Sequence, residues 1–179
     1  MSDKEIIDLY RDGQEDRALE EIVAAYSERL YWHVRRFTCS HEDADDLLQD
    51  ILIKVWKSLA TFRSDSQLYT WIYRVATNEC LNFIRKNRVK ASLRAETLET
   101  ILDRQVDDDP SFDGDSLQRE VQKAVNSLPA KQKLVFVLRY FDEMPYEQMS
   151  QVLGTSVGSL KASYHHAYYK VKEYLEKRF

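Results

Sequence analysis

The chain has 179 residues, of which 44% are hydrophobic and 31% are charged. This length suits one domain or two small ones, and the composition is too polar for a membrane protein. Four glycines and three prolines provide too few turns for an all-β sandwich or barrel, and the glycines are too scattered to form a phosphate-binding loop. Cys39 and Cys80 are the only cysteines, and in the absence of a secretory signal or a long apolar run they indicate a reducing cytoplasm.

The net charge of −4 is unevenly distributed along the chain. Residues 1–90 carry −2, residues 91–115 carry −6 and residues 116–179 carry +4. We therefore predict an all-α protein with two small helical domains, 1–90 and 116–179. The acidic bridge 91–115 contains few large apolar residues, and such a composition buries too little surface to offset the entropy lost on ordering. We expect a flexible linker there. The large apolar residues of its most acidic part are Leu102, Val106 and Phe112.

Three helices are predicted at the start of the first domain. Ser2 and Glu5 have the spacing of a capping box, and Gly13 would end the short helix that they open. Apolar residues then recur at steps of three and four over 16–37, which is the period of a helix with one buried face. Ser40 has the character of an N-cap, and acidic residues follow it where the helix dipole favours them.

The third of these helices has a polar face that is broken by one isoleucine. Asp46, Gln49, Asp50 and Ile53 project from the side opposite the apolar stripe. One interpretation is a solvated surface with a single exposed apolar residue, which is common. The other is a docking face, on which the carboxylates attract a basic partner and Ile53 supplies the central apolar contact.

A polar loop over 62–67 leads into a helix predicted over 68–88. One face of this helix carries an aromatic ring, two cations and two carboxamides. Such groups suit unpaired nucleic acid, because rings stack on bases, amides bind base edges and arginines hold phosphates. The alternative is an ordinary polar face whose tryptophan packs between helices. The residues of this face are Trp71, Arg74, Asn78, Asn82 and Arg85.

The second domain has the outline of a helix-turn-helix. A short helix opened by Pro145 and closed by Gly154 precedes a turn and a long helix that runs through Leu175. In this motif the N-terminal half of the second helix enters the major groove. Helical hairpins that bind nothing share the pattern, so it does not by itself establish DNA binding. The residues left available near that half are Ser159, Lys161, Ser163, His165, His166 and Tyr169.

Four stretches together resemble one family. Residues 43–56, 62–78, 128–132 and 146–161 are similar to bacterial RNA polymerase sigma factors of the extracytoplasmic-function (ECF) group. The resemblance covers nearly the whole chain and includes the order of two helical domains with a variable linker between them. It implies a promoter-specificity subunit that works with core RNA polymerase and promoter DNA and is held inactive by an anti-sigma factor.

The resemblance also implies roles for particular residues. The polar face of the third helix falls where the family binds the clamp of the largest polymerase subunit. The next helix falls where the −10 strand is separated, and Ser156 to Tyr169 fall where the −35 duplex is read. A departure from the family is the recognition helix, where Lys161 and two histidines stand in place of several arginines, so we expect weaker and less salt-dependent DNA binding. The loop residues that would capture a flipped −10 base are Phe62, Arg63, Ser64, Asp65, Ser66 and Gln67.

Two alternatives to this interpretation are a decoy for an anti-sigma factor and a metal-dependent enzyme. A decoy that binds only an anti-sigma partner should have lost the strand-opening face, which this chain retains. An enzyme with a carboxylate-bridged metal bundle would need a Glu-x-x-His pair, and the sequence has none. Cys39 and His41 are the only closely spaced cysteine and histidine, and we interpret that pair as incidental. We therefore expect no catalytic residues, no metal and no cofactor.

Overall fold

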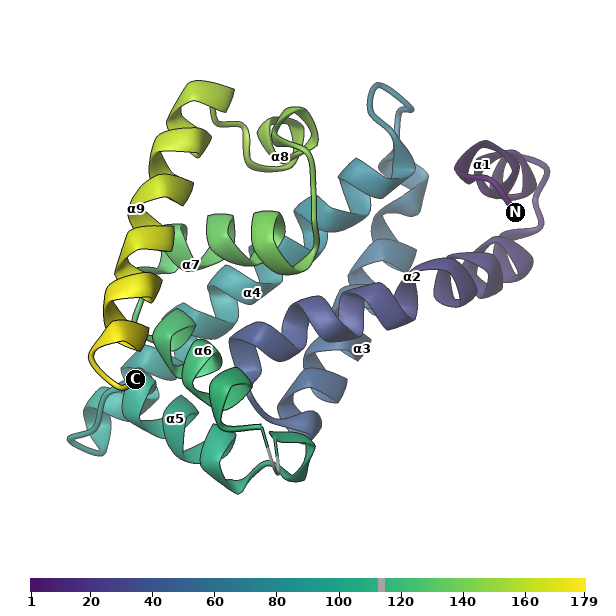
Figure 1. Ribbon diagram of the computed structural model, residues 1–179. Helices are drawn as coiled ribbons and strands as arrows, with labels where there is room; N and C mark the ends of the chain where they lie inside the picture. Colours follow the sequence, from purple (N-terminus) through teal and green to yellow (C-terminus); the bar gives the residue numbers. More distant parts are fainter. Residues whose placement is uncertain (113–114) are drawn as a thin grey trace.

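A computed structural model describes residues 1–112 and 115–179, and the regular structure across these two ranges is entirely helical. The all-α prediction is confirmed (Figure 1). No helix within these ranges is both long and apolar enough to cross a membrane. In chain order the elements are α1 (Asp3–Arg11), α2 (Glu15–Thr38), α3 (His41–Ser58), η1 (Leu59–Thr61), α4 (Leu68–Leu93), α5 (Leu98–Asp108), η2 (Pro110–Phe112), α6 (Ser116–Asn126), α7 (Ala130–Phe136), η3 (Val137–Phe141), α8 (Tyr146–Leu153) and α9 (Val157–Glu176).

The predicted helix ends are present and are hydrogen bonded as their residue types suggest. The capping box at α1 is complete, because Ser2 Oγ accepts from the Glu5 amide at 3.3 Å and the Glu5 carboxylate accepts from the Ser2 amide at 2.6 Å. Ser40 Oγ accepts from the amide of Asp43 at 3.2 Å and so caps α3. Gly154 ends α8 with a φ of +64°, a left-handed conformation that glycine adopts without strain.

The first half of the chain is a bundle of α2, α3 and α4, with α1 packed across α2. The apolar stripes predicted on these helices face one another, and Leu30, Ile51 and Ile72 at the centre are fully buried. The hydroxyl of Tyr26 in α2 donates to the Asp3 carboxylate at 2.5 Å and holds α1 in place. Packing of amphipathic faces, rather than helix propensity, therefore positions the polar faces of α3 and α4.

The second half contains the predicted helix-turn-helix, formed by α8 and α9. α9 packs on α7 and on α8, and α8 packs on η3. The buried side chains of Leu138, Met149 and Leu160 belong to one core cluster. The helix-turn-helix is thus supported by a core that leaves one side of α9 exposed to solvent.

The expected flexible linker is wrong for residues 98–108, which form α5. Leu102 is 2% exposed and Val106 is fully buried, and both pack against the buried Cys39. Apolar residues four positions apart lie on the same face of a helix. Two of them can therefore anchor a helix when neighbouring elements already offer an apolar surface. Asp113 and Gly114 of the same segment lie outside the described residues. The domain boundaries at 90 and 115 stay a prediction.

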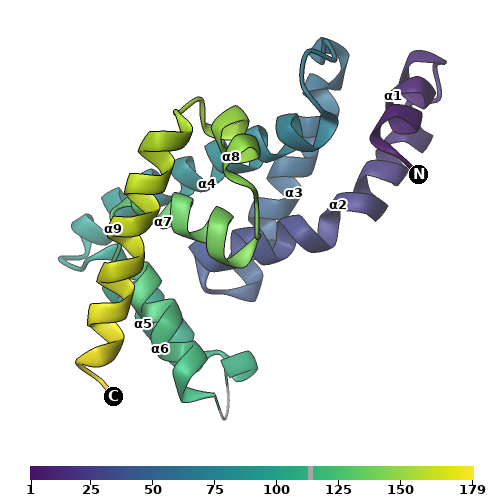
Figure 2. The same cartoon turned by 45° about the horizontal axis from the view of Figure 1, so that its top comes forward.

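The two halves are docked on one another. Figure 2 shows α8 lying beside α4 and the end of α7 beside α2, and residue contacts join α4 to α8 and α2 to η3. The His33 imidazole is fully buried and pairs with the Asp142 carboxylate at 2.6 Å. Next to this pair the Arg36 guanidinium lies 3.8 Å from the centre of the Phe141 ring. One apolar core therefore runs through both halves.

Candidate nucleic-acid interface

The polar face of α3 is exposed as the sequence predicts. Asp46, Gln49 and Asp50 are exposed and Ile53 is 50% exposed, whereas Ile51, on the opposite side of the same helix, is fully buried. Four neighbouring side chains thus present two carboxylates, an amide and an apolar group to solvent. This composition suits a partner that offers cations around an apolar centre.

A groove of about 320 Å³ separates this face from the lysines of α4. Asp46 and Asp50 line its α3 side, and Lys86 and Lys90 line its α4 side. The acidic face of α3 and the basic end of α4 therefore lie side by side. Such an arrangement separates a surface for a basic partner from a surface for a polyanion.

The face of α4 that is predicted to bind nucleic acid is a connected row of side chains. The Arg85 guanidinium donates to Asn82 Oδ1 at 3.3 Å, and the Asn82 amide donates to the Glu79 carboxylate at 3.4 Å. Asn78 is exposed on the same side of the helix. The hydrogen bonds orient these groups but leave the amide of Asn78 and the guanidinium of Arg85 accessible to bases and phosphates.

The loop before α4 is held against α1 and against the first turn of α4. Phe62 packs on Trp71 with ring centres 5.3 Å apart, and the Arg11 guanidinium donates to Ser64 Oγ at 2.8 Å. Ser64 has a φ of +60°, so the backbone turns sharply at the tip of the loop. The loop and the first turn of α4 thus form one aromatic and polar surface. Its exposed or half-buried side chains are Phe62, Arg63, Ser64, Asp65, Ser66 and Gln67.

The helix-turn-helix covers part of this surface. The Arg74 guanidinium donates through Nε to the backbone carbonyl of Gln151 in α8 at 2.8 Å. A cavity of about 580 Å³ lies between the loop and α8, and it is lined by Ser64, Ser66 and Gln148 among others. The structure therefore brings the predicted strand-opening face and the predicted duplex-reading domain into direct contact, which no pattern in the sequence had indicated.

The exposed side of α9 carries few cations. Ser156 Oγ accepts from the amide of Ser159 at 3.2 Å and caps the helix, and the exposed Lys161 ammonium lies 5.8 Å from the centre of the Tyr146 ring. Ser163 is half-buried, whereas His166 is exposed. The ring centres of His165 and Tyr169 lie 4.6 Å apart, with the ring planes tilted by 56°, so these two exposed side chains contact one another on the helix surface.

Cys39, His41 and Cys80 take part in hydrogen bonds or in core packing. Cys39 is buried and donates to Asn126 Oδ1 at 3.4 Å, and His41 Nδ1 shares a hydrogen bond with the Tyr31 hydroxyl at 2.6 Å. The described part of the chain contains no group of three or more side chains that could hold a metal ion. Cys80 is fully buried among core residues, which confirms the packing role predicted for it.

Comparisons with known proteins agree with this geometry. The sigma-70 region 2 family matches residues 22–89, and the sigma-70 region 4 family matches residues 118–171. The ECF RNA polymerase sigma factor SigW of Bacillus subtilis is 28% identical over 173 residues, which is 92% of each chain. The ECF RNA polymerase sigma-E factor of Escherichia coli is 26% identical over 90% of this chain and 88% of its own length.

Two solved structures share the fold. CnrH, solved in complex with the cytosolic domain of CnrY, is 22% identical, with a TM-score of 0.72 over 99% of each chain. RpoE of Bartonella quintana, solved with the anti-sigma factor NepR, is 23% identical, with a TM-score of 0.66 over 88% of this chain and 96% of its own. Both sigma-70 regions are present in their family order on the predicted fold, so the chain belongs to the extracytoplasmic-function group of RNA polymerase sigma factors.

Proposed function

We propose that the chain binds core RNA polymerase, selects promoters and helps to open the −10 region, and that it has no catalytic chemistry of its own. The observation that carries the proposal is the presence of both sigma-70 regions, each with an exposed face suited to its partner. We place this activity in the cytoplasm, where core polymerase and promoter DNA are found.

The α3 face would bind the clamp of the largest polymerase subunit. Its exposed carboxylates suit a basic surface, and the half-exposed Ile53 offers an apolar anchor at the centre. Asp46, Gln49 and Asp50 surround that anchor as the polar rim. The face lies on a rigid helix whose other side is buried, so little entropy is lost when the partner binds.

The surface of the 62–67 loop and α4 would capture unpaired bases of the −10 element. Flipping a base out of the duplex costs a few kcal/mol, and stacking on an aromatic ring returns about 1–3 kcal/mol per base. Trp71 and Phe62 supply rings, while Asn78, Asn82 and Arg85 supply hydrogen-bond donors to base edges and phosphates. Capture of a few bases can therefore tip the balance toward melting, with polymerase contacts supplying the rest.

The exposed side of α9 would read the −35 duplex. Ser156, Ser159 and Lys161 lie in its first turns, where a recognition helix meets the major groove. Ser163, His165, His166 and Tyr169 continue along the helix. With Lys161 the only lysine or arginine near this end of the helix, electrostatic affinity for the duplex should be modest.

The two domains must separate before both elements are bound. Positions −10 and −35 lie about 25 base pairs apart, which is about 85 Å at a rise of about 3.4 Å per base pair. Arg74 on the −10 surface and Gln151 in α8 are joined by a 2.8 Å hydrogen bond in this structure. The docked arrangement therefore cannot place one domain on each element, and we infer that it represents a form that is not bound to a promoter.

An anti-sigma factor would hold the chain inactive by covering the polymerase-binding surface. Two proteins that share the fold were solved with CnrY and with an anti-sigma factor, respectively. A partner that favours the docked arrangement would inhibit the chain in two ways. It would cover the α3 face, and it would keep the −10 surface against α8.

Reconstituted transcription tests the proposal. Purified core polymerase with this chain should start RNA at defined positions on genomic fragments, and core polymerase alone should not. In gel-shift titrations the holoenzyme should bind a promoter duplex and the free chain should bind it poorly, because the free chain is acidic and docked. If core polymerase does not take up the chain, or takes it up without initiating at defined sites, the proposal fails, and the second result would favour the decoy class.

A further inference from the structure

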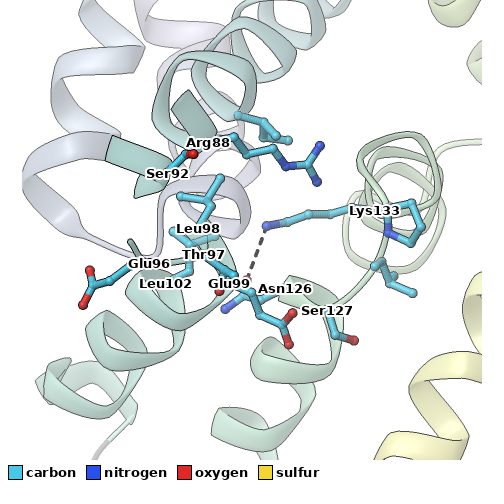
Figure 3. A pocket seen from close by; sticks show the side chains of 13 residues that line it. Arg88, Ser92, Glu96, Thr97, Leu98, Glu99, Leu102, Asn126, Ser127 and Lys133 are labelled. Carbon is cyan, nitrogen blue, oxygen red and sulfur yellow. Dashed lines mark hydrogen bonds between the residues drawn. The ribbon is translucent and has the colours of Figure 1, made fainter. Parts of the chain in front are cut away.

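A second cavity lies on the far side of the domain junction, away from the surfaces assigned above. It has a volume of about 510 Å³ and is enclosed by the C-terminal half of α4, the N-terminus of α5 and the connection between α6 and α7. Figure 3 shows that Lys133 and Arg88 reach into it from opposite walls. Small-molecule sites commonly have volumes of this size, lined by apolar groups with a few convergent polar ones.

The Lys133 ammonium is buried in this cavity with a neutral partner. Lys133 is 3% exposed, and its Nζ donates to Asn126 Oδ1 at 3.3 Å. That oxygen also accepts from the Gln122 amide at 3.1 Å and from the Cys39 thiol at 3.4 Å, so it is shared among three donors. Within the described ranges no carboxylate lies at ion-pair distance from Lys133. A buried cation in such surroundings calls for an anion.

The surroundings make this lysine easier to deprotonate than it is in water, and a bound anion would favour its charged form. Burial lowers the pKa of Lys133, because the charged form loses its hydration. The Asn126 amide nitrogen donates to the Asp103 carboxylate at 3.0 Å, so this carboxylate bonds to the partner of Lys133 and not to Lys133 itself. The Lys133 ammonium is thus linked to the Asp103 carboxylate through the Asn126 amide, and it also lies 5.6 Å from the centre of the Phe37 ring. Its side chain lines the cavity (Figure 3).

Other donors converge on the same space. Arg88 is exposed at the mouth of the cavity, and among the described residues it has no ion-pair partner. Ser92 adds a hydroxyl group to the lining, whereas the hydroxyls of Thr97 and Ser127 are already hydrogen bonded to Thr100 and to the Ala124 carbonyl. Thr97 is the N-cap of the 11-residue α5, whose first amides carry a partial positive charge.

The acidic residues at the rim leave this set intact. Glu96 is paired with Arg104 at 2.8 Å, and Figure 3 shows its carboxylate directed away from Lys133. Glu99 also lines the cavity and is exposed, so its charge is partly screened by solvent. Two cations carry more charge than the one exposed carboxylate beside them would neutralise, and together with the Ser92 hydroxyl they match a phosphate dianion.

We propose that this cavity binds a phosphate-bearing small molecule, with the phosphate between Lys133 Nζ and the Arg88 guanidinium. The organic part of the ligand would rest against Ile84, Leu98 and Leu128, which supply the apolar lining. The ligand would touch α4 of the first half and the α6 to α7 connection of the second. It would therefore stabilise the docked form and disfavour the extended form that a promoter requires. This last consequence rests on the proposed function, whereas the binding itself does not.

Calorimetric titration of the full-length chain tests the proposal. The probes are inorganic phosphate, pyrophosphate and adenosine diphosphate, with sodium chloride at matched ionic strength as the control. At least one phosphate compound should bind saturably with a Kd below about 1 mM and should raise the melting temperature, and chloride should do neither. Binding of all three compounds would identify the phosphate as sufficient, whereas binding of adenosine diphosphate alone would show that the organic part is needed.

Two variants and a matched control locate the binding. K133M should weaken it at least about tenfold, and its fold should persist because it replaces a buried charge by an apolar side chain of similar length. R88Q, at an exposed position, should weaken binding by about the same factor. K131M alters an exposed lysine two positions away on α7 and should leave the affinity unchanged. The proposal would be overturned if none of the three phosphate compounds bound saturably. It would also be overturned if K131M and K133M lost the same amount of affinity. Neither readout involves transcription, so failure here is separate from failure of the sigma-factor function.

Discussion

His33 in α2 and Asp142, directly after η3, form a buried ion pair 2.6 Å long between residues that are 109 positions apart in the chain. The imidazole is fully buried, and its ring packs edge-on against Tyr73 of α4 at 5.4 Å. The pair therefore ties α2 and α4 of the first half to the second half. Arg36 over Phe141 extends the same contact. This cluster is the polar centre of the docked arrangement.

Removal of one partner should weaken that arrangement. Asp142→Asn replaces the charge-assisted hydrogen bond by a weaker one, and we expect a loss of about 2 kcal/mol in the free energy of unfolding. Urea denaturation of the full-length chain measures this loss. Glu143→Gln is the matched control, because Glu143 is adjacent and exposed and should change stability by less than about 0.5 kcal/mol. Equal effects of the two substitutions would show that the pair does not hold the domains.

The same pair should make stability depend on pH. Burial alone would lower the pKa of His33, but the charge and hydrogen bond of Asp142 outweigh burial and raise it to about 10. A raised pKa stabilises the folded form fully below pH 6.5, the ordinary value, and this contribution is lost as the pH rises through about 10. Burial also raises the pKa of the neighbouring Tyr73, so its phenol stays neutral over this range.

The free energy of unfolding should therefore fall steadily between about pH 7 and pH 10 in the unaltered chain. In Asp142→Asn the fall should be clearly smaller, since His33 then has no carboxylate to hold its proton. Urea denaturation at several pH values compares the two slopes. Parallel slopes would assign the pH dependence to groups other than His33.

Local signals in the sequence were sufficient for the helices. Ser2 and Ser40 opened helices through their side-chain hydrogen bonds, and Gly154 ended one, because each of these effects depends on residues within one turn. The exposed face of α3 followed from its period in the same way. The roles of the individual site residues on those faces stay a prediction.

The docking of the domains could not be predicted, because it rests on contacts that leave no periodic pattern. Arg74 binds a backbone carbonyl of α8, which any residue at position 151 would offer. His33 and Asp142 are polar residues whose pairing spans most of the chain. Residues 98–108 were expected to be flexible because the segment has few apolar residues, yet Cys39, directly after α2, packs with Leu102 and Val106 in a small core. The composition of a segment does not show the apolar contacts that a segment distant in the sequence provides in the fold.

Charge introduced at the centre of the α3 face should disrupt polymerase binding. Ile53 is 50% exposed, and Ile53→Asp would place a carboxylate where an apolar contact is expected. We expect a loss of about 2 kcal/mol, or about 30-fold in affinity for core polymerase, as for a typical interface anchor. Fluorescence anisotropy of the labelled chain with core enzyme measures it. Val23→Asp, at a residue of α2 that is 39% exposed, is the control and should bind normally. Unchanged affinity of Ile53→Asp would remove α3 from the interface.

Truncation of the ring in the first turn of α4 should impair strand opening. Trp71→Ala removes the surface on which an unpaired base would stack, at a cost of about 1–3 kcal/mol. Permanganate reactivity of −10 thymines should fall by about tenfold, while the affinity of the variant for core polymerase stays unchanged. Trp32→Ala serves as the control, since Trp32 is 52% exposed on α2 and lies outside the proposed DNA surface. An equal loss of reactivity in both variants would argue against a role for Trp71 in melting.

Loss of one cation from α9 should change the salt dependence of promoter binding in a defined way. Lys161 is exposed near the N-terminus of the helix, and a phosphate contact there would release about one counterion. For holoenzyme on a duplex with the −35 element, Lys161→Ala should reduce the slope of log K against log salt by about 0.9. Lys172→Ala is the control, because this lysine lies at the other end of α9 and is 3.9 Å from the Glu176 carboxylate. If both substitutions leave the slope unchanged, the phosphate contacts of this domain come from elsewhere, and the N-terminal half of α9 does not enter the groove.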